Sequence, residues 1–262
     1  MRGIILAAGK GARLNGISRE DPKCLVEVGG LTLIERQIRA LKSAGVHDVT
    51  VVVGFGAERV RERCGPDISY IENISYDRTN SLYSLWLASD LLFDGFVVLN
   101  ADVLFHIQLL RDLLKAQYED ALLVGYCDEA TAALGDEEMK VKVRKGQVVD
   151  ISKEMNPRDA DGENVGIVKF GRSGAKLLVE CMNLIVSRGN GREWAPSAFR
   201  DFAIRRQLHA ISTRGYPWIE IDFPEDLDRA ANEILPRINL SDESFVSAPT
   251  AAAAISIQNA AL

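Results

Sequence analysis

Long apolar runs, clustered cysteines and an excess of positive charge are all missing from this 262-residue sequence. No apolar run reaches the roughly 18 residues of a membrane-spanning helix, and GIILAA is too short for the core of a signal peptide. The four cysteines (Cys24, Cys64, Cys127 and Cys181) lack the spacing of metal ligands, which favours reduced thiols. A net charge of −6 argues against a general nucleic-acid surface. We therefore expect a cytoplasmic protein that binds neither membrane nor nucleic acid.

The first half of the chain alternates between two kinds of segment. Apolar runs typical of buried strands lie at 3–8, 48–55, 68–73 and 95–102, and segments with helical periodicity lie at 31–45, 57–65 and 79–92. Continuous apolar strands that alternate with helices indicate a parallel sheet with helices on both faces. The pattern therefore predicts an α/β fold with a Rossmann-like sheet.

The second half has a different pattern. Residues 139–153 alternate between apolar and polar on both sides of Lys145-Gly146, which predicts a β-hairpin. A strand at 165–171, helices at 173–189 and 195–207, a strand at 218–222 and a helix at 224–235 are expected next. The sheet is thus expected to be mixed and mostly parallel, flanked by helices, with a hairpin excursion in the second half. We expect one domain over 1–239, with halves 1–127 and 128–239, and a flexible tail at 240–262.

A glycine-rich turn, LAAGKGARL at 6–14, follows the first expected strand. It is not a dinucleotide fingerprint, because Leu14 stands where the third glycine is required, and the chain has no Walker-A motif. Glycines let backbone N–H groups approach phosphate oxygens, and Arg13 and Lys23 would neutralise the charge. The turn is therefore either a phosphate-binding loop or a flexible connection between strand and helix.

Several motifs in a fixed order resemble those of a known family. LAAGKGARL followed by PKCLVEVGG resembles the signature of the sugar-nucleotidyltransferase superfamily, and ADVLF, DISKEM, NVGIVKF and WIEIDFPEDLDRA resemble its later motifs. One departure is Asn100-Ala101, which replaces the usual glycine before the strand-end aspartate. NISYDRTNSLYSL is similar to cytidylyltransferases that act on phosphocholine, 2-aminoethylphosphonate or inositol phosphate. The resemblance implies an enzyme that joins CMP from CTP to a small phosphorylated or phosphonate acceptor and releases pyrophosphate.

The resemblance also implies roles for individual residues. Arg13 and Lys23 are the expected triphosphate ligands, Lys153 the clamp for the acceptor's phosphate, and Asp102 and Asp222 the ligands of Mg²⁺. The expected nucleotide-binding residues are Leu6, Ala7, Ala8, Gly9, Lys10, Gly11, Asn73, Thr79, Asn80, Ser81, Ser84 and Ala101. Candidate acceptor-binding residues in 128–239, the expected acceptor-binding half, are Asp161, Gly166, Trp194, Tyr216, Trp218 and Glu220, of which Glu220 could share in metal binding. The aromatic and acidic candidates are equally compatible with core packing or a solvated loop.

The expected chemistry needs no general base. A phosphate acceptor has a second pKa of about 6, so its attacking oxygen is already ionised near neutral pH. The three histidines (His47, His106 and His209) lie in no recognisable motif. The main difficulty is bringing two anions together, which calls for metal and cationic side chains around an in-line transition state.

Other interpretations remain open from the sequence. The chain could be a sugar-1-phosphate nucleotidyltransferase that uses UTP, dTTP or GTP, or a non-catalytic nucleotide-binding regulatory subunit. The presence of Arg13, Lys23, Asp102 and Asp222 together argues against the second alternative. The sequence does not choose between choline, amine and polyol acceptors, and it is compatible with a homo-oligomer.

Overall fold

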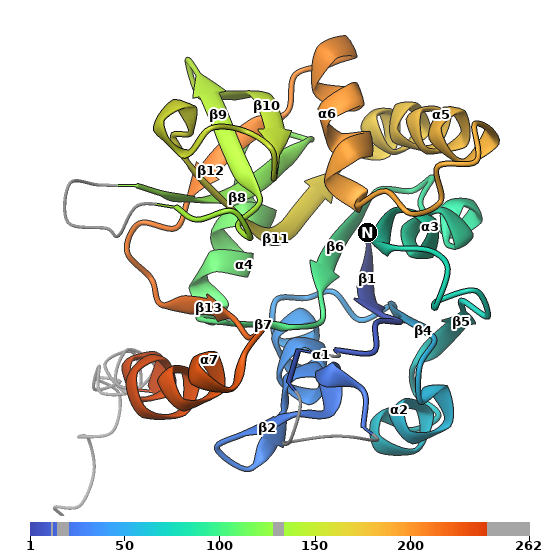
Figure 1. Ribbon diagram of the computed structural model, residues 1–262. Helices are drawn as coiled ribbons and strands as arrows, with labels where there is room; N and C mark the ends of the chain where they lie inside the picture. Colours follow the sequence, from blue (N-terminus) through green and yellow to red (C-terminus); the bar gives the residue numbers. More distant parts are fainter. Residues whose placement is uncertain (12, 15–20, 128–133, 240–262) are drawn as a thin grey trace, which may run out of the picture.

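The computed structural model describes residues 1–11, 13–14, 21–127 and 134–239, and its centre is a nine-stranded sheet (Figure 1). The strands lie in the order β5-β4-β1-β6-β11-β8-β12-β10-β9. The sheet is mixed and is flanked by helices, which confirms the expected α/β class. The tail expected at 240–262 lies outside the described residues.

The strands of the first half pair in parallel, as the sequence predicts. They are β1 (Arg2–Ala7), β4 (Val49–Val53), β5 (Ser69–Glu72) and β6 (Phe96–Asn100). They are connected by the helices α1 (Leu33–Ser43), α2 (Ala57–Cys64) and α3 (Ser81–Leu87). The connections also contain a ribbon of β2 (Glu27–Val28) and β3 (Leu31–Thr32) and the 3-10 turns η1 (Lys23–Leu25) and η2 (Ser89–Leu91). Parallel pairing places the carboxyl ends of these strands at one edge of the sheet, where α/β proteins bind ligands.

From residue 107 onward the chain adds strands whose pairings are mainly antiparallel. These strands are β8 (Ala121–Tyr126), β9 (Lys140–Arg144), β10 (Gln147–Ser152), β11 (Gly162–Phe170) and β12 (His209–Ser212). β11 lies antiparallel between β6 and β8, and it also pairs with β9, so that the five strands form a closed ring of pairings. Antiparallel pairing therefore takes a larger share of the sheet than the sequence indicated. The remaining elements of this region are α4 (Ile107–Lys115), α5 (Arg172–Ser187), α6 (Ala195–Arg205) and the turn η3 (Pro157–Asp159).

Helices cover both faces of the sheet. Successive residues of β1 point to opposite faces, so Ile4 packs into one apolar core with α3, α5 and α6, whereas Ile5 packs into another with α1, α2 and α4. Figure 1 shows α3, α5 and α6 together on the right of the molecule. Among the described helices, none has the length and the apolar character needed to cross a bilayer.

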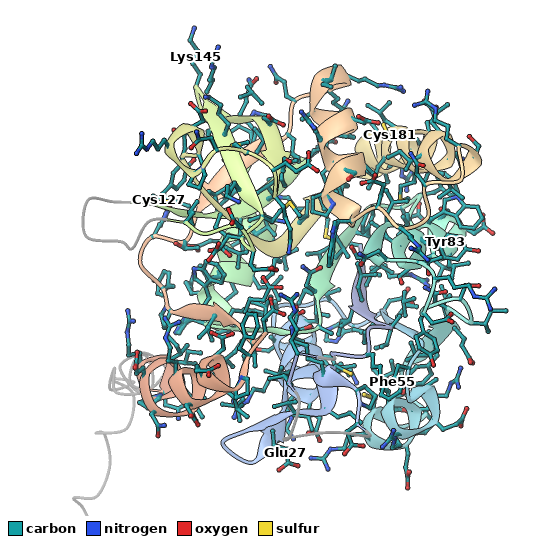
Figure 2. The ribbon with its side chains drawn as sticks, in the orientation of Figure 1. Glu27, Phe55, Tyr83, Cys127, Lys145 and Cys181 are labelled. Carbon is teal, nitrogen blue, oxygen red and sulfur yellow. The ribbon has the colours of Figure 1, made fainter. Side chains whose placement is uncertain are left out.

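The predicted hairpin is confirmed and turns where the sequence placed the turn. Lys145 and Gly146 both have positive φ (51° and 75°), as in a type I′ turn. Figure 2 shows Lys145 at the far tip of the hairpin, pointing away from the rest of the molecule. The opposite ends of β9 and β10 are therefore the ones that approach the body of the protein.

The strand expected at 218–222 does not join the main sheet. It forms β13 (Trp218–Glu220), which pairs antiparallel with β7 (Val103–Phe105) in a separate two-stranded sheet. The chain continues into α7 (Pro224–Arg229), a π-helical turn η4 (Ala230–Ile234) and a further helical segment at 235–239. Pro236 lacks an N–H group and its ring would clash with a regular preceding turn, which accounts for the wider π turn. Apolar residues of this segment, including Ile234 and Leu235, form a third core with Leu33 and Ile219.

Candidate active site

A cavity of about 310 Å³ lies at the carboxyl ends of β1 and β6. Parallel strands end here, so the cavity occupies the usual ligand-binding edge of an α/β sheet. Residues of both halves line it: Leu6, Ala7, Gly9, Gly11, Arg13, Lys23, Cys24, Asn80, Ser81, Asn100, Ala101, Asp102, Glu137, Met139, Lys153, Asn164, Trp194, Pro196, Glu220 and Asp222.

Lys23 stands between two aspartates in this cavity. Its Nζ donates to Asp102 Oδ2 at 2.8 Å and to Asp222 Oδ1 at 2.6 Å, and its side chain is 11% exposed. Burial alone would lower the pKa of Lys23, but the two neighbouring carboxylates outweigh burial and raise it above its ordinary value. Lys23 is therefore a permanent cation that joins the two expected metal ligands.

Three carboxylates converge beside this lysine. Oxygen atoms of Asp102, Glu220 and Asp222 lie within 4.8 Å of one another. The N–H of Ile221 donates to the carbonyl of Asp102 at 3.0 Å, which holds the end of β13 against the segment after β6. Asp222 thus reaches the site from the end of the small β7–β13 sheet, whereas Asp102 reaches it from the end of the main-sheet strand β6.

The carboxylate cluster contains one buried oxygen without a hydrogen bond and one carboxyl group with a raised pKa. Among the described residues, none gives a hydrogen bond to Asp102 Oδ1, although this atom is buried. Burial, together with the charges of Asp102 and Asp222, raises the pKa of Glu220 to about 8. Buried carboxylate oxygens without partners are the groups that a hard divalent cation would satisfy.

Arg13 and Lys153 approach each other through Glu137. Glu137 Oε2 lies 2.8 Å from a terminal nitrogen of Arg13 and 3.5 Å from Lys153 Nζ. The hydrogen bond from Arg13 and the charges of both cations lower the pKa of Glu137. Lys153 Nζ also lies 4.8 Å from the centre of the Trp194 ring, a cation–π distance. Two cations from opposite halves of the chain therefore flank one anion in the cavity.

The glycine turn follows β1 and lies directly against Lys23. Gly11 has a φ of +66°, and a Cβ on it would lie 2.5 Å from Cβ of Lys23, so only glycine fits there. Gly9 and Gly11 line the cavity, whereas Ala8 is buried and does not. Lys10 does not line the cavity either, and its Nζ lies 5.5 Å from the ring centre of Phe55.

Only part of the expected nucleotide-binding stretch reaches the cavity. Asn80 and Ser81 line it at the start of α3, where the Asn80 side chain accepts a hydrogen bond from the N–H of Ser81. Asn73 is 1% exposed, and its Nδ2 donates to Thr79 Oγ1 and Ser84 Oγ, both at 3.0 Å. Asn73, Thr79 and Ser84 do not line the cavity. Their hydrogen bonds to one another favour a role in supporting the loop that carries Asn80.

The candidate acceptor residues divide in the same way. Trp194 and Glu220 line the cavity. Outside it, Asp161 accepts a hydrogen bond from the N–H of Val143, and Tyr216 stacks on His106 with ring centres 4.9 Å apart. Trp218 packs on Gly125. Core packing therefore describes Tyr216 and Trp218 better than acceptor binding, and a solvated loop describes the exposed Asp161 better.

Gly166 contributes to the site only through its neighbours. It has a φ of +80°, and a Cβ on it would lie 2.8 Å from Nδ2 of Asn100, which lines the cavity. Its N–H donates to the side chain of Asn164, another lining residue. The glycine therefore lies against two asparagines that line the cavity, and a larger residue there would displace Asn100.

Six lining residues were not singled out from the sequence. They are Cys24, Asn100, Glu137, Met139, Asn164 and Pro196. Cys24 and Asn100 directly adjoin expected site residues, so proximity along the chain was a usable signal. Glu137 lies just before the hairpin in a stretch without periodicity, and no local pattern indicates that it would meet Arg13.

Comparisons with known proteins agree on the class of this chain. A family model described as a MobA-like NTP transferase domain matches residues 3–157. The chain is 26% identical to CTP:phosphoglutamine cytidylyltransferase of Campylobacter jejuni, over 87% of its own length and 98% of the relative. It is 33% identical to choline-phosphate cytidylyltransferase of Streptococcus pneumoniae, over 52% of its length and 60% of the relative. The solved inositol-1-phosphate CTP transferase of T. maritima has the same fold, with a TM-score of 0.74 at 20% identity over 91% of this chain and 96% of that one. The chain belongs to the MobA-like NTP transferase family and is a nucleotidyltransferase.

Proposed function

We propose that this chain is a cytidylyltransferase, which transfers CMP from CTP to a small phosphorylated or phosphonate acceptor and releases pyrophosphate. The observation that carries the proposal is the arrangement of Asp102, Asp222 and Lys23 beside the glycine turn. Carboxylates next to a permanent cation and a turn rich in backbone N–H groups are suited to holding a nucleoside triphosphate. The similarity to proteins named as users of CTP supports the choice of nucleotide.

The carboxylate cluster fits a magnesium ion. Asp102 and Asp222 would hold it, and Glu220 would join them after losing its proton. The buried Asp102 Oδ1, which no described residue satisfies, supports this assignment. Mg²⁺ prefers one or two carboxylates together with phosphate oxygens and water. A bound Mg²⁺ would stabilise the negative charge that develops on the phosphates during transfer.

The chain's own side chains would bring the two anions together. Arg13 and Lys23 would bind the triphosphate, and their positive charges would offset the charge that grows around the α-phosphorus. Lys153, on the opposite side of Glu137, would bind the phosphate or phosphonate of the acceptor. Among the described residues that line the cavity there is no histidine, which suits a nucleophile that is already ionised.

Polar side chains near the start of α3 would bind the base. Asn80, Ser81 and Asn100 line the cavity and offer amide and hydroxyl groups. Cytosine differs from uracil in an exocyclic amine donor and a ring-nitrogen acceptor, so such groups can distinguish the two bases. The free thiols of Cys24, Cys64 and Cys181 support a reducing cytoplasmic compartment. We place the whole activity in one domain over 1–239.

Pyrophosphate release measured with each of the four nucleoside triphosphates tests the proposal. The acceptor panel should contain phosphocholine, 2-aminoethylphosphonate, inositol phosphate, phosphoglutamine and a sugar 1-phosphate. We expect turnover with CTP, Mg²⁺ and one acceptor of the first four kinds. Turnover with UTP, dTTP or GTP and a sugar 1-phosphate, but not with CTP, would make the chain a sugar nucleotidyltransferase. Nucleotide binding without turnover for every acceptor would favour a regulatory subunit.

A further inference from the structure

Lys140 carries a fully buried positive charge next to the cavity. The residue is 0% exposed at the start of β9, yet its side chain ends in an ammonium group. Nζ donates to the backbone carbonyl of Lys153 at 2.7 Å and to that of Glu138 at 3.2 Å. Hydrogen bonds from a charged donor are stronger than those between neutral groups. Lys140 therefore joins two pieces of main chain through its side chain.

The two carbonyls lie at the open end of the β9–β10 hairpin. Glu138 precedes β9, and Lys153 follows β10. The last pair of this ladder is Ser152 opposite Lys140, so Lys153 is the first residue beyond the backbone pairing. The ladder leaves the carbonyl of Lys153 without a partner across the hairpin, and the Lys140 ammonium supplies one.

The same end of the hairpin carries three residues of the cavity. Glu137 and Met139 lie on the incoming side, and Lys153 lies on the outgoing side. Lys140 itself does not line the cavity. Its contact with the site runs through the backbone of the residues that it joins.

Burial of this ammonium is not explained by stability alone. Taking a charge out of water costs several kcal/mol unless good partners compensate it, and an apolar side chain of similar size is often as stable. Lys140 has compensating charge nearby, because it lies directly opposite Glu163 in the β9–β11 pairing. An ammonium differs from an apolar side chain of that size because it donates directed hydrogen bonds, here to two main-chain carbonyls.

We propose that Lys140 is a positioning residue, which fixes Lys153 and the Glu137 segment at the site by joining the two ends of the hairpin. This inference rests on the proposed role of Lys153 in binding the acceptor. Lys140 acts mainly on the acceptor side of the site, because it binds the carbonyl of Lys153 itself, whereas it can reach Arg13 only through the neighbouring Glu137 segment. Removing its ammonium should release Lys153 directly, leave Lys23 in place, and affect Arg13 only through the contact with Glu137.

The chain contains a matched control for a buried lysine. Lys169 on β11 is 4% exposed, and its Nζ donates to the carbonyls of Ala116 at 3.0 Å and Leu114 at 3.5 Å. These carbonyls belong to the end of α4, and neither they nor Lys169 line the cavity. Lys169→Met therefore removes the same kind of interaction at a place without contact to the site.

Hydrogen exchange measured by mass spectrometry tests the positioning directly and needs no substrate. In Lys140→Met, peptides that cover 137–139 and 152–156 should exchange about tenfold faster or more, because the contact that orders them is lost. In Lys169→Met these peptides should keep the exchange rates of the wild type, and faster exchange should appear near 114–117. Unchanged protection of 152–156 in Lys140→Met would overturn the proposal.

Kinetics test the consequence for the reaction. Lys140→Met should raise KM for the acceptor about tenfold and leave the Kd for CTP within about twofold, because only one charge-assisted contact is weakened. In a Lys153→Ala background the same substitution should change acceptor kcat/KM by less than about twofold, since Lys140 acts through Lys153. If Lys140→Met does not fold, Lys140→Gln keeps one amide donor and should show a smaller shift in the same direction.

The outcomes separate this inference from the proposed function. If the wild type turns over no acceptor with any nucleotide, the proposed function is wrong, and hydrogen exchange still decides whether Lys140 orders residue 153. If the wild type is active and Lys140→Met equals Lys169→Met in acceptor KM, the positioning role is wrong. An equal additional loss from Lys140→Met with and without Lys153 would show that Lys140 acts by another route.

Discussion

At the scale of single residues, the site balances its charges internally. Lys23 pairs with Asp102 and Asp222, and Glu137 pairs with Arg13 and Lys153. Apart from Glu220, each group that is proposed to bind metal or phosphate thus already has a partner of opposite charge. Binding of Mg²⁺ and of two anionic substrates must break these ion pairs and replace them with contacts to the ligands. The affinity for each ligand therefore depends on the ion pair that it breaks.

Replacing either strand-end aspartate should abolish turnover. We expect Asp102→Asn and Asp222→Asn to lower kcat by about 100-fold or more, because a neutral amide binds Mg²⁺ weakly and leaves the phosphate charge uncompensated. Pyrophosphate release at saturating Mg²⁺ is the measurement. Asp94→Asn is a suitable control, since Asp94 is exposed and pairs with Arg172 on the surface. A variant of Asp102 or Asp222 with the wild-type rate would remove that residue from the metal site.

The raised pKa of Glu220 predicts a dependence of stability on pH. An unfolded glutamate has a pKa near 4.3, whereas that of Glu220 in the folded protein is about 8. The folded state therefore binds this proton more tightly than the unfolded state. Its contribution to the free energy of unfolding is complete below about pH 4.3 and is lost as the pH rises to about 8. Without added metal, the difference in stability between wild type and Glu220→Gln should fall across this range in urea unfolding.

Added Mg²⁺ provides the complementary measurement. Metal binding must displace the proton of Glu220, so Mg²⁺ should raise the Tm of the wild type more at pH 8 than at pH 6. Glu220→Gln has no proton to displace at this position, and its response to Mg²⁺ should vary less between the two pH values. Equal pH dependence in both proteins would show that Glu220 does not titrate in the site.

The sequence identified several charged residues of the site, such as Asp102 and Lys23, but not the roles of the polar ones. Asp102 could be placed because it directly follows a buried strand, and strand ends converge in a parallel sheet. Asn73 could not be assigned, because a local pattern does not tell whether an amide faces a ligand or a neighbouring hydroxyl. Glu137 meets Arg13 across 124 positions of the chain, and only the tertiary fold brings them together.

At the scale of elements, the β9–β10 hairpin was the easiest second-half feature to predict. Its two arms alternate with a period of two, and a glycine stands at the turn. β12 gave no comparable signal, because it has four residues and none of them is buried. β13 was recognised as a strand, but its partner was not, since apolar character does not specify which neighbour a strand pairs with.

One residue in the turn of this hairpin can be replaced to increase the free energy of unfolding. Lys145 has a φ of 51°, a conformation that asparagine adopts more readily than lysine. Lys145→Asn should raise the free energy of unfolding by roughly 0.5–1 kcal/mol, seen as a higher urea midpoint with an unchanged slope. Arg144→Asn, at the neighbouring position without positive φ, should give no gain. Turnover should stay at the wild-type rate, because Lys145 points away from the body of the protein (Figure 2).

At the scale of the whole molecule, the cavity joins distant parts of the chain. Its lining runs from Leu6 to Asp222 and includes residues of both halves. The glycine turn and the strand-end aspartate come from the parallel half, whereas Lys153 and Trp194 come from the mixed half. Neither half could form the site alone, which supports treating 1–239 as one functional unit.

The last prediction concerns where the chain can be shortened. Every described residue that lines the cavity precedes 223, so a protein that ends at Asn239 should keep its turnover rate and its Tm within about 2 °C. A protein that ends at Phe223 should behave differently, because it loses Ile234, Leu235 and Ile238 from the third core. Burying aliphatic side chains contributes about 1.5–3 kcal/mol each, so this truncation should cost roughly 5 kcal/mol or more.

The longer truncation should also damage the site itself. The side chain of Asp226 accepts hydrogen bonds from the N–H groups of Asp222 at 3.0 Å and Phe223 at 2.9 Å. Without them, the proposed metal ligand Asp222 loses the contact that holds its backbone at the start of α7. Thermal unfolding and pyrophosphate release on both truncated proteins check the contrast. If ending the chain at Asn239 removes activity, residues 240–262 contribute to the site or to an oligomer that the reaction needs.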